Sequence, residues 1–221
     1  VSHEHKTPLT SISGYAEIIR EGMVKSEDVG RFAGKIYEEA QRLITLVEDI
    51  LNLSHLDEGA PGQERRQGID LYALCERAVA SLAEAARQRG IAISLTGSRQ
   101  RVDGAEKLLA EIIFNLCDNA IKYNQENGHV AVSVTREGDR VVLAVQDTGI
   151  GIPPGETDRV FERFYRVDKS HSKEIGGTGL GLSIVKHAAA YHDAKIQLDS
   201  QLGRGTRVRV LFPLSQKEAQ P

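Results

Sequence analysis

A ladder of polar side chains offers the clearest chemistry in the sequence. Glu111, Asn115, Asn119 and Lys122 recur at intervals of four, four and three residues, so they share one face of a helix. Carboxylate and amide oxygens suit Mg²⁺, which binds through few protein groups plus phosphates, and a nearby lysine can take a phosphate charge. The polar ladder therefore predicts a site for a magnesium–phosphate ligand, although a solvated helix face would explain the same spacing.

Two glycine-rich turns strengthen the prediction of a phosphate ligand. The first runs from Asp147 to Pro153 and the second from Gly177 to Leu182. Glycine is used where the backbone needs positive φ or where a ligand must approach it closely. The second turn leads into a helical pattern that ends near Tyr191, and the free N–H groups at a helix start favour a phosphate. Neither common glycine motif for nucleotides fits, so we expect a different nucleotide pocket with a mobile flap between the turns.

Asp147 is the candidate for base recognition. It follows a strand pattern and directly precedes the first glycine turn. A buried carboxylate in this position would accept a hydrogen bond from an adenine amino group. The alternative is an aspartate that caps the turn, which is common.

The start of the chain carries a candidate nucleophile. His3 and Thr7 are four residues apart and share a helix face, and Pro8 should kink the helix one turn after His3. A neutral imidazole attacks well near pH 7, and a carboxylate such as Glu4 can hold its other ring N–H. We therefore expect His3 to be the nucleophile, with His5 as a rival by residue type.

Composition bounds the class of protein. The 221 residues are 40% hydrophobic and 27% charged with a net charge of −3, which is typical of a soluble globular chain and disfavours generic nucleic-acid binding. Cys75 and Cys117 lack metal-ligand spacing and are expected to be reduced core residues. No apolar run approaches the ~18 residues that span a bilayer. Because the chain begins at Val1, we expect a fragment of a longer protein.

The first 57 residues favour two helices joined by a turn near residues 22–28. The apolar heptad positions of the second helix are Val29, Ala33, Ile36, Ala40, Leu43, Val47 and Ile50. A lone hairpin cannot bury this surface, so two hairpins are expected to pair into a four-helix bundle as a homodimer. Packing against the following domain is the alternative. The expected division is a hairpin over 1–60, a linker over 61–68 and a second domain over 69–221, because Pro61 and three glycines lie within 59–68.

The second domain mixes helices with adjacent strand pairs. Helices are expected over 70–89, 105–123 and 180–191, with Asp70 as an N-cap. Strands are expected over 91–95, 129–135, 141–146, 195–199 and 206–212. Because the strands follow one another as hairpins and not as βαβ units, we infer an α+β sandwich with a mixed sheet and helices on one face.

These motifs, in this order, resemble the catalytic core of sensor histidine kinases of bacterial two-component systems. The boxes are Ser2–Thr10 for the phosphoacceptor, Asn115–Tyr123 for the asparagine box, Asp147–Pro153 and Gly177–Leu182 for the two glycine boxes, and Phe161–Arg166 for the phenylalanine box. The resemblance implies a dimeric four-helix bundle followed by an α/β sandwich ATP-binding domain with a mixed sheet, of the fold shared with gyrase, mismatch-repair and chaperone ATPases.

The resemblance also implies residue roles. His3 would be phosphorylated, Glu4 would help to activate it, and Thr7 would orient water for dephosphorylating the partner. In the second domain Asn115 would bind Mg²⁺, and Asn119 and Lys122 would face the phosphates. Tyr123 and Asp147 would contact the adenine, with Thr206 nearby. Arg166, which we prefer over Arg163, would contact a phosphate from the flap. The implied backbone of the pocket is Gly149, Gly151, Gly177, Thr178, Gly179, Leu180, Gly181 and Leu182.

Two positions in the phosphoacceptor box depart from the usual family pattern. His5 stands where an apolar residue is common, and Lys6 stands in the place of an arginine. His192-Asp193 replaces glycines often found there, which we interpret as a loop variation.

The implied activity is autophosphorylation on histidine with ATP and Mg²⁺, then transfer to an aspartate of a response regulator receiver domain, with phosphatase activity toward that regulator. The implied assembly is a homodimer that binds no nucleic acid, in a cytoplasmic fragment of a membrane-anchored parent. The alternatives are a chain that acts mainly as a phosphatase, a nucleotide-sensing dimer without catalysis, and a protein serine kinase of the same ATP-binding fold.

Overall fold

The computed structural model describes residues 2–57, 64–167 and 177–215. The chain divides into two compact units, Val1–Asn52 and Leu53–Pro221, here called the N-terminal and C-terminal units. The division falls inside a helix, earlier than the boundary after residue 60 that the composition suggests. Residues 58–63, which include the first three residues of the expected linker, are outside the described residues.

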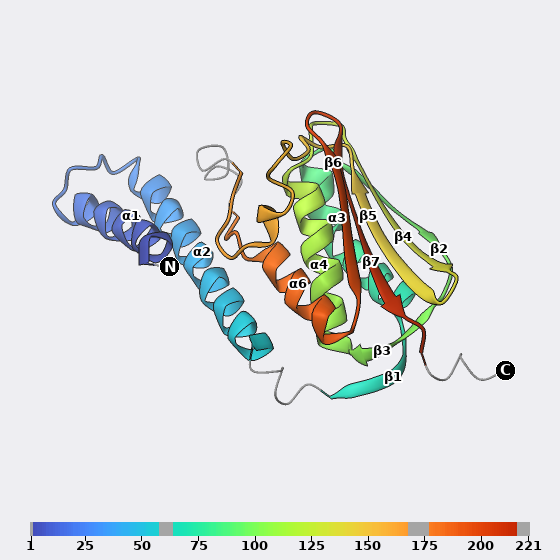
Figure 1. Ribbon diagram of the computed structural model, residues 1–221. Coiled ribbons are helices and arrows are strands. Elements are labelled where there is room, and N and C mark those ends of the chain that lie inside the picture. The colour runs from blue at the N-terminus through green and yellow to red at the C-terminus, as the bar shows by residue number, and fades with distance from the viewer. Residues whose placement is uncertain (1, 58–63, 168–176, 216–221) are drawn as a thin grey trace. The chain divides into compact units, whose positions relative to one another are not determined.

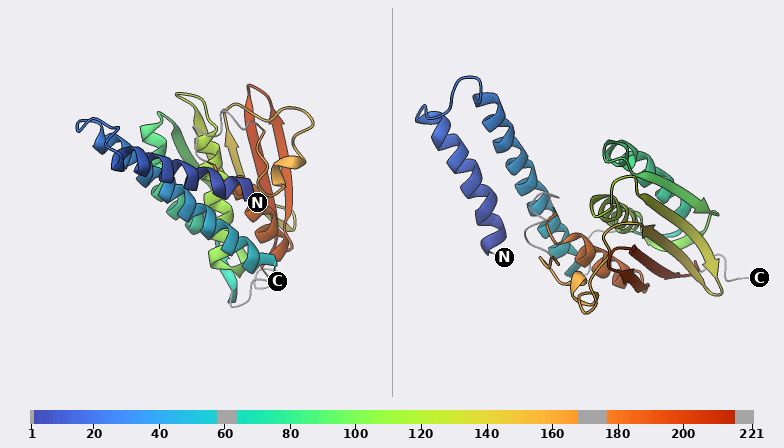
Figure 2. Two further views of the ribbon diagram at one scale, coloured as in Figure 1. Left: turned by 90° about the vertical axis from the view of Figure 1, so that its left-hand side faces the viewer. Right: turned by 90° about the horizontal axis from the view of Figure 1, so that it is seen from above.

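The N-terminal unit is a helical hairpin, as predicted. Helix α1 (Ser2–Arg20) and the start of α2 (Val29–Asp57) lie side by side (Figure 2). Near the turn, the rings of Tyr15 and Phe32 meet edge to face at 5.7 Å between centroids. Helix α1 continues across the buried Pro8, and the Thr10 hydroxyl donates to the Lys6 carbonyl over 2.8 Å.

The C-terminal unit is built on a five-stranded mixed sheet. The strand order is β2 (Ala92–Gly97), β4 (His129–Glu137), β5 (Arg140–Asp147), β7 (Gly205–Pro213) and β6 (Lys195–Gln201). The two predicted hairpins, β4–β5 and β6–β7, are both antiparallel. Strand β2 runs parallel to β4, so the expectation of adjacent hairpin pairs was wrong for this strand. Its partner comes after an intervening helix, and local sequence does not specify such pairings.

Helices cover one face of this sheet (Figure 1). They are α3 (Leu71–Gln88), α4 (Glu106–Lys122) and α6 (Gly181–Tyr191). The core lies between the layers, where alternate strand residues point at the helices; the central ones are Val130, Val132, Val134, Val141, Leu143, Val145, Val208, Val210 and Phe212. Period-two strands and amphipathic helices thus give the two-layer sandwich that the patterns predict. A short 3-10 turn, η1 (Arg159–Phe161), ends at the first residue of the phenylalanine box.

A second, two-stranded sheet was not predicted. Strand β1 (Arg65–Asp70) pairs antiparallel with β3 (Arg101–Ala105), so residues 65–68 form a strand where the sequence suggested a linker. Each strand contains a single large apolar residue, Ile69 in β1 and Val102 in β3, which explains why pattern alone missed them. Asp70 then caps α3, and its Oδ1 accepts from the Ala73 N–H over 3.0 Å, as predicted. Cys75 and Cys117 are free and fully buried, which confirms them as core residues.

Candidate nucleotide site

Asp147 lies at the end of β5 on the face of the sheet that the helices cover, opposite Val130. Its Oδ1 accepts two backbone hydrogen bonds, from Gly149 N at 2.8 Å and from Thr206 N at 3.1 Å. Burial raises the pKa of this carboxyl, and the two N–H donors act in the opposite direction. Because both bonds use Oδ1, Oδ2 remains available, as far as the described residues go, to a ligand that offers a hydrogen-bond donor.

Two glycines of the first glycine turn, and Gly205 of the β6–β7 hairpin, pack too tightly against their surroundings for a side chain. A Cβ at Gly149 would lie 2.2 Å from the Tyr123 carbonyl oxygen, and one at Gly151, whose φ is +68°, would lie 2.1 Å from the Gln201 carbonyl oxygen. A Cβ at Gly205 would lie 2.1 Å from the Asp147 carbonyl oxygen. These contacts fix the backbone beside Asp147 between the end of α4 and the β6–β7 hairpin.

The polar ladder lies on α4 next to the start of α6. Asn115 is half-buried and its Nδ2 donates to the Glu111 carbonyl at 2.9 Å, which leaves the amide oxygen turned away from its own helix. A Cβ on Gly181 would lie 2.8 Å from Asn115 Oδ1 and 3.5 Å from Asn119 Nδ2. The second glycine turn therefore brings the N-terminus of α6 against two members of the ladder. Amide oxygens and free helix N–H groups so placed fit a phosphate ligand with its cation.

Lys122 and Tyr123 complete the α4 side of the site. The Lys122 ammonium is paired with Asp118 at 2.6 Å, and both side chains are partly buried. Tyr123 forms the C-cap of α4, and its carbonyl accepts from Ile150 N at 3.0 Å in the first glycine turn. A Cβ on Gly177 would lie 3.0 Å from the Tyr123 hydroxyl, so this one residue contacts both turns.

The phenylalanine box is fastened to the second glycine turn. Phe164 has a φ of +63°, unusual for a residue with a side chain, and its N–H donates to the Gly179 carbonyl over 2.9 Å. A Cβ on Gly179, whose φ is +73°, would lie 2.9 Å from the Phe164 carbonyl carbon. Leu180 behind the turn is fully buried, and Leu182 packs on the core. The phenylalanine box and the second glycine turn thus form one packed unit.

The phenylalanine box also contains two arginines. Arg166 is half-buried, whereas Arg163 is exposed and its Nη2 lies 3.5 Å from Nε2 of His187 on α6. Residues 168–176, the remainder of the expected flap, lie outside the described residues.

Sequence patterns did not single out a role in the site for three further residues of the C-terminal unit. Ser200 of β6 accepts from Ile152 N at 2.8 Å and lies 2.9 Å from the Thr206 hydroxyl, so it joins the first glycine turn to the β6–β7 hairpin. Asp118 holds Lys122, and its place within the asparagine box was the one available hint. His192, interpreted from sequence as a loop variation, is a buried residue that is only 1% exposed.

The phosphoacceptor box begins α1 in the N-terminal unit. The side chains of His3 and Glu4 lie outside the described part of the structure, and their roles stay predictions. Thr7 is exposed one turn after His3. Among the described residues, no helix is both long enough and apolar enough to cross a membrane.

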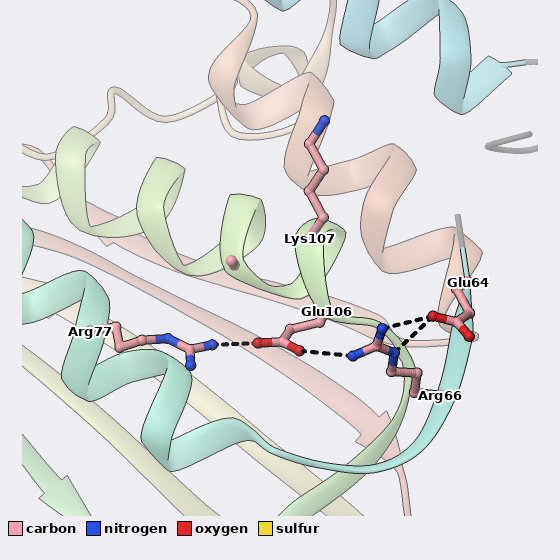
Figure 3. Close-up of a pocket in the computed structure, with 6 residues that line it drawn as sticks. Glu64, Arg66, Arg77, Glu106 and Lys107 are labelled. Carbon is pink, nitrogen blue, oxygen red and sulfur yellow. Dashed lines mark hydrogen bonds and ion pairs between the residues drawn. The ribbon is translucent and has the colours of Figure 1, made fainter. Parts of the chain in front are cut away.

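A separate open pocket of about 370 Å³ lies near the first turn of α4 (Figure 3). It is lined by Glu64, Arg66, Arg77, Glu106, Lys107 and Ala110. Glu106 pairs with Arg77 at 2.5 Å and with Arg66 at 3.9 Å, and Arg66 also pairs with Glu64 at 2.7 Å. This chain of ion pairs joins β1, α3 and α4. Glu106 lies about 13 Å along the helix from Asn115, so the pocket is distinct from the nucleotide site.

Comparison with known proteins agrees with this arrangement. Residues 1–59 match the family described as His Kinase A (phospho-acceptor) domain, and residues 104–216 match the family described as histidine kinase-, DNA gyrase B- and HSP90-like ATPase. The chain is 40% identical over 214 residues to the sensor-like histidine kinase SenX3 of Mycolicibacterium smegmatis, which covers 96% of this chain and 56% of that protein. The chain thus spans about half the length of the curated relatives it matches.

Two solved structures have the same fold. Histidine kinase AdeS of Acinetobacter baumannii superposes with a TM-score of 0.79 at 23% identity, over 96% of this chain and 98% of that one. Histidine kinase ThkA, solved in complex with the response regulator protein TrrA, superposes with a TM-score of 0.77 at 22% identity, over 99% and 61%. At these identities the likeness shows the fold alone. Together with the two family matches and the SenX3 relative, it establishes that the chain belongs to the sensor histidine kinases, as their phosphoacceptor hairpin and ATPase domain.

Proposed function

We propose that the chain uses ATP with Mg²⁺ to phosphorylate His3 and then passes the phosphoryl group to an aspartate of a response regulator. One observation carries the proposal: Asp147, Asn115 and both glycine turns meet at one end of the C-terminal unit, in a chain whose other unit matches the phosphoacceptor family. The match to the ATPase family supports ATP as the nucleotide.

Each site residue has a task that its surroundings support. Asp147 Oδ2 would accept from the adenine amino group, while Oδ1 stays bound to Gly149 and Thr206. The Asn115 amide oxygen would hold Mg²⁺, which neutralises charge on the transferring phosphate. Asn119 would contact the phosphates together with the N–H groups of the second glycine turn. Lys122 would join them after its ion pair with Asp118 breaks. Arg166 would reach a phosphate from the flap.

The proposed reaction consists of two phosphoryl transfers. The bond between the γ-phosphorus and its bridging oxygen breaks as a bond to the His3 imidazole forms; ADP leaves and Glu4 takes the ring proton. The phosphoryl group then moves from the imidazole to a carboxylate oxygen of the receiver domain, and neutral His3 is restored by a proton from solvent. The ThkA structure, solved with its response regulator, supports this class of partner.

The direct test is to map the phosphorylated residue. The chain is incubated with ATP labelled at the γ position, and the product is treated with acid, which hydrolyses phosphohistidine. We expect an acid-labile label in the wild-type chain and in His5→Gln, and none in His3→Gln. A label that survives in His3→Gln and disappears in His5→Gln would move the phosphorylation site to His5.

Phosphatase activity toward the regulator is a second proposed function. Thr7 is exposed one turn after His3, where its hydroxyl would orient a water molecule for attack on the phosphoaspartate. Thr7→Ala should retain autophosphorylation and lose most of the release of inorganic phosphate from phosphorylated regulator. Equal release by the two proteins would remove Thr7 from this role.

We also propose a homodimer and a membrane-anchored parent. Tyr37, Ile44, Val47 and Leu51 of α2 are exposed although apolar, which supports a second hairpin as their partner. The curated relatives are about twice as long as this chain and are sensors by description, which supports an anchoring region elsewhere in the parent. Fractionation of cells that express the whole parent would test its anchoring: recovery in the soluble fraction would contradict it.

A further inference from the structure

His192 follows the last residue of α6 and lies inside the protein, 1% exposed. Its Nδ1 lies 2.6 Å from the Ala188 carbonyl, and its Nε2 accepts from the Ala105 N–H over 3.1 Å. A carbonyl only accepts and an N–H only donates, so these partners require the neutral ring with its proton on Nδ1. A second proton, on Nε2, would face the Ala105 N–H and abolish that bond.

The space around the ring is shaped for it. A Cβ on Gly104 would lie 2.0 Å from His192 Cδ2, so only glycine fits beside the imidazole. Tyr191 and Phe212 meet the ring edge to face at 5.1 Å and 6.1 Å between centroids.

Two charged groups that pair with each other at 3.6 Å act on the ring. Arg65 of β1 opposes its protonation and Asp193, the next residue, favours it. The neighbours from β3 and β7, Gly104 and Phe212, carry no charge. Burial is the largest influence, and it lowers the pKa of His192 below its ordinary value of 6.5.

The bond to Ala105 joins the two helices that form the nucleotide site. Ala105 is the N-cap of α4, which carries Asn115 and Asn119 further along. His192 is the C-cap of α6, whose first residue, Gly181, lies so near these asparagines that a Cβ on it would meet both. The helices are therefore antiparallel, joined by His192 at one end and lined with ligand residues at the other. The eleven residues of α6 separate these ends by about 16 Å.

We propose that His192 is a positioning residue for nucleotide binding, whose protonation at Nε2 in acid releases α6 from Ala105 and weakens the binding of MgADP and MgATP. The inference rests on the proposed function, because it assumes that the second glycine turn at the start of α6 contacts the phosphates. It adds a residue at the far end of α6 whose protonation changes the affinity for the nucleotide.

The wild-type protein provides the first test. NMR titration of the full chain should show His192 with the Nδ1–H tautomer at pH 7.5. Coupling between two sites is reciprocal, so saturation with MgADP should move the midpoint of the His192 titration about one pH unit lower, in step with a roughly tenfold affinity change. A midpoint that MgADP leaves unchanged would overturn the proposal.

The second test compares variants by calorimetric titration with MgADP from pH 7.5 down to the lowest pH at which circular dichroism shows the chain to be folded. His192→Gln keeps a side-chain acceptor and donor but does not titrate in this range. We expect the wild-type affinity to fall about tenfold more than that of His192→Gln. Protonation of the nucleotide and of Asp147 affects both proteins alike. The matched control is His129→Gln: His129 is exposed and its ring contacts Ser94, so this variant should follow the wild-type profile.

The outcomes separate the two proposals. Failure of the folded wild-type chain to bind MgADP at pH 7.5 would overturn the proposed function and this role of His192 with it. Binding at pH 7.5 with the same pH profile in wild type and His192→Gln would overturn the role of His192 alone. If His192→Gln does not fold, as judged by circular dichroism, the NMR titration of the wild-type protein decides.

Discussion

A single carboxyl group shows how the C-terminal unit combines stability with ligand recognition. Burial raises the pKa of Asp147, and the N–H groups of Gly149 and Thr206 hold its charged form in place. One oxygen thereby organises the first glycine turn and the β6–β7 hairpin, while the other is free for the adenine in the proposed complex. Below its raised pKa the carboxyl is protonated and ceases to be a pure acceptor, so recognition of an amino group requires pH above that value.

Asp147→Asn should weaken ATP binding by roughly 10-fold to 100-fold, because hydrogen bonds to charged groups contribute about 1.5–3 kcal/mol. The measurement is calorimetric titration at pH 7.5. Asp199→Asn, an exposed aspartate on β6, is the matched control and should bind as the wild type does. Equal affinities in all three proteins would show that Asp147 does not contact the base.

The two cysteines should be chemically inert in the folded protein. Burial raises the pKa of the Cys117 thiol to about 12 and that of Cys75 further, so neither forms thiolate at neutral pH. A thiol-reactive chromogenic disulfide should therefore label neither residue at pH 7.5 and both after unfolding in guanidinium. Rapid labelling of the native protein would mean that α3 and α4 open locally.

At the scale of elements, the site depends on where helices start and end. Helix α4 has an apolar face in the core and a polar ladder on another face, and α6 begins at the glycine turn that approaches this ladder. The phenylalanine box is held to the same turn by Phe164 and Gly179. A change in this turn should therefore affect ligand binding more than it affects the stability of the sheet.

Gly179→Ala tests the packed turn. Both Gly179 and Gly138 have positive φ, and a Cβ costs about 1 kcal/mol in that conformation. At Gly138 a Cβ meets nothing within 4 Å, whereas at Gly179 it meets the backbone of Phe164. We expect Gly138→Ala to lower thermal stability only, and Gly179→Ala also to slow autophosphorylation by about 10-fold to 100-fold, since small misplacements of phosphate-binding groups have such effects. Equal rates in the two variants would show that Phe164 can move aside.

At the scale of the whole molecule, the N-terminal unit exposes more apolar surface than a lone hairpin in water should. Tyr37, Ile44 and Leu51 are spaced by seven residues along α2 and are 66%, 50% and 54% exposed. These residues directly follow the predicted heptad positions Ile36, Leu43 and Ile50, so they widen the predicted seam as a four-helix bundle requires. The proposed dimer would cover it with the same stripe of a second chain.

Ile44→Asp should therefore convert the dimer into a monomer, because a charge would be buried in the seam without a partner. Light scattering after size exclusion should give a mass near 24.2 kDa for this variant and twice that for the wild type. Thr45→Asp places the same charge about 100° around the helix and should leave the dimer intact. A monomeric wild-type chain, or a dimeric Ile44→Asp, would contradict the proposed bundle.

The sequence by itself determined the features that depend on neighbours along the chain. The helices of the hairpin, the strands β4 to β7, the Asp70 cap and the glycine turns follow from periodicity, capping and backbone freedom, which act over a few residues. The family likewise followed from short motifs in order. Within the site, the ladder on α4 was visible because a helix repeats its faces every three to four residues.

The tertiary structure alone decided the pairings between distant segments. Strands β1 and β3 each contain a single large apolar residue, and β2 pairs with β4, from which β3 and α4 separate it along the chain. His192 could be interpreted as a surface loop residue because its partner Ala105 is 87 positions away. Burial and hydrogen bonding of such a residue depend on which backbone groups folding brings to it, and no local propensity encodes that information.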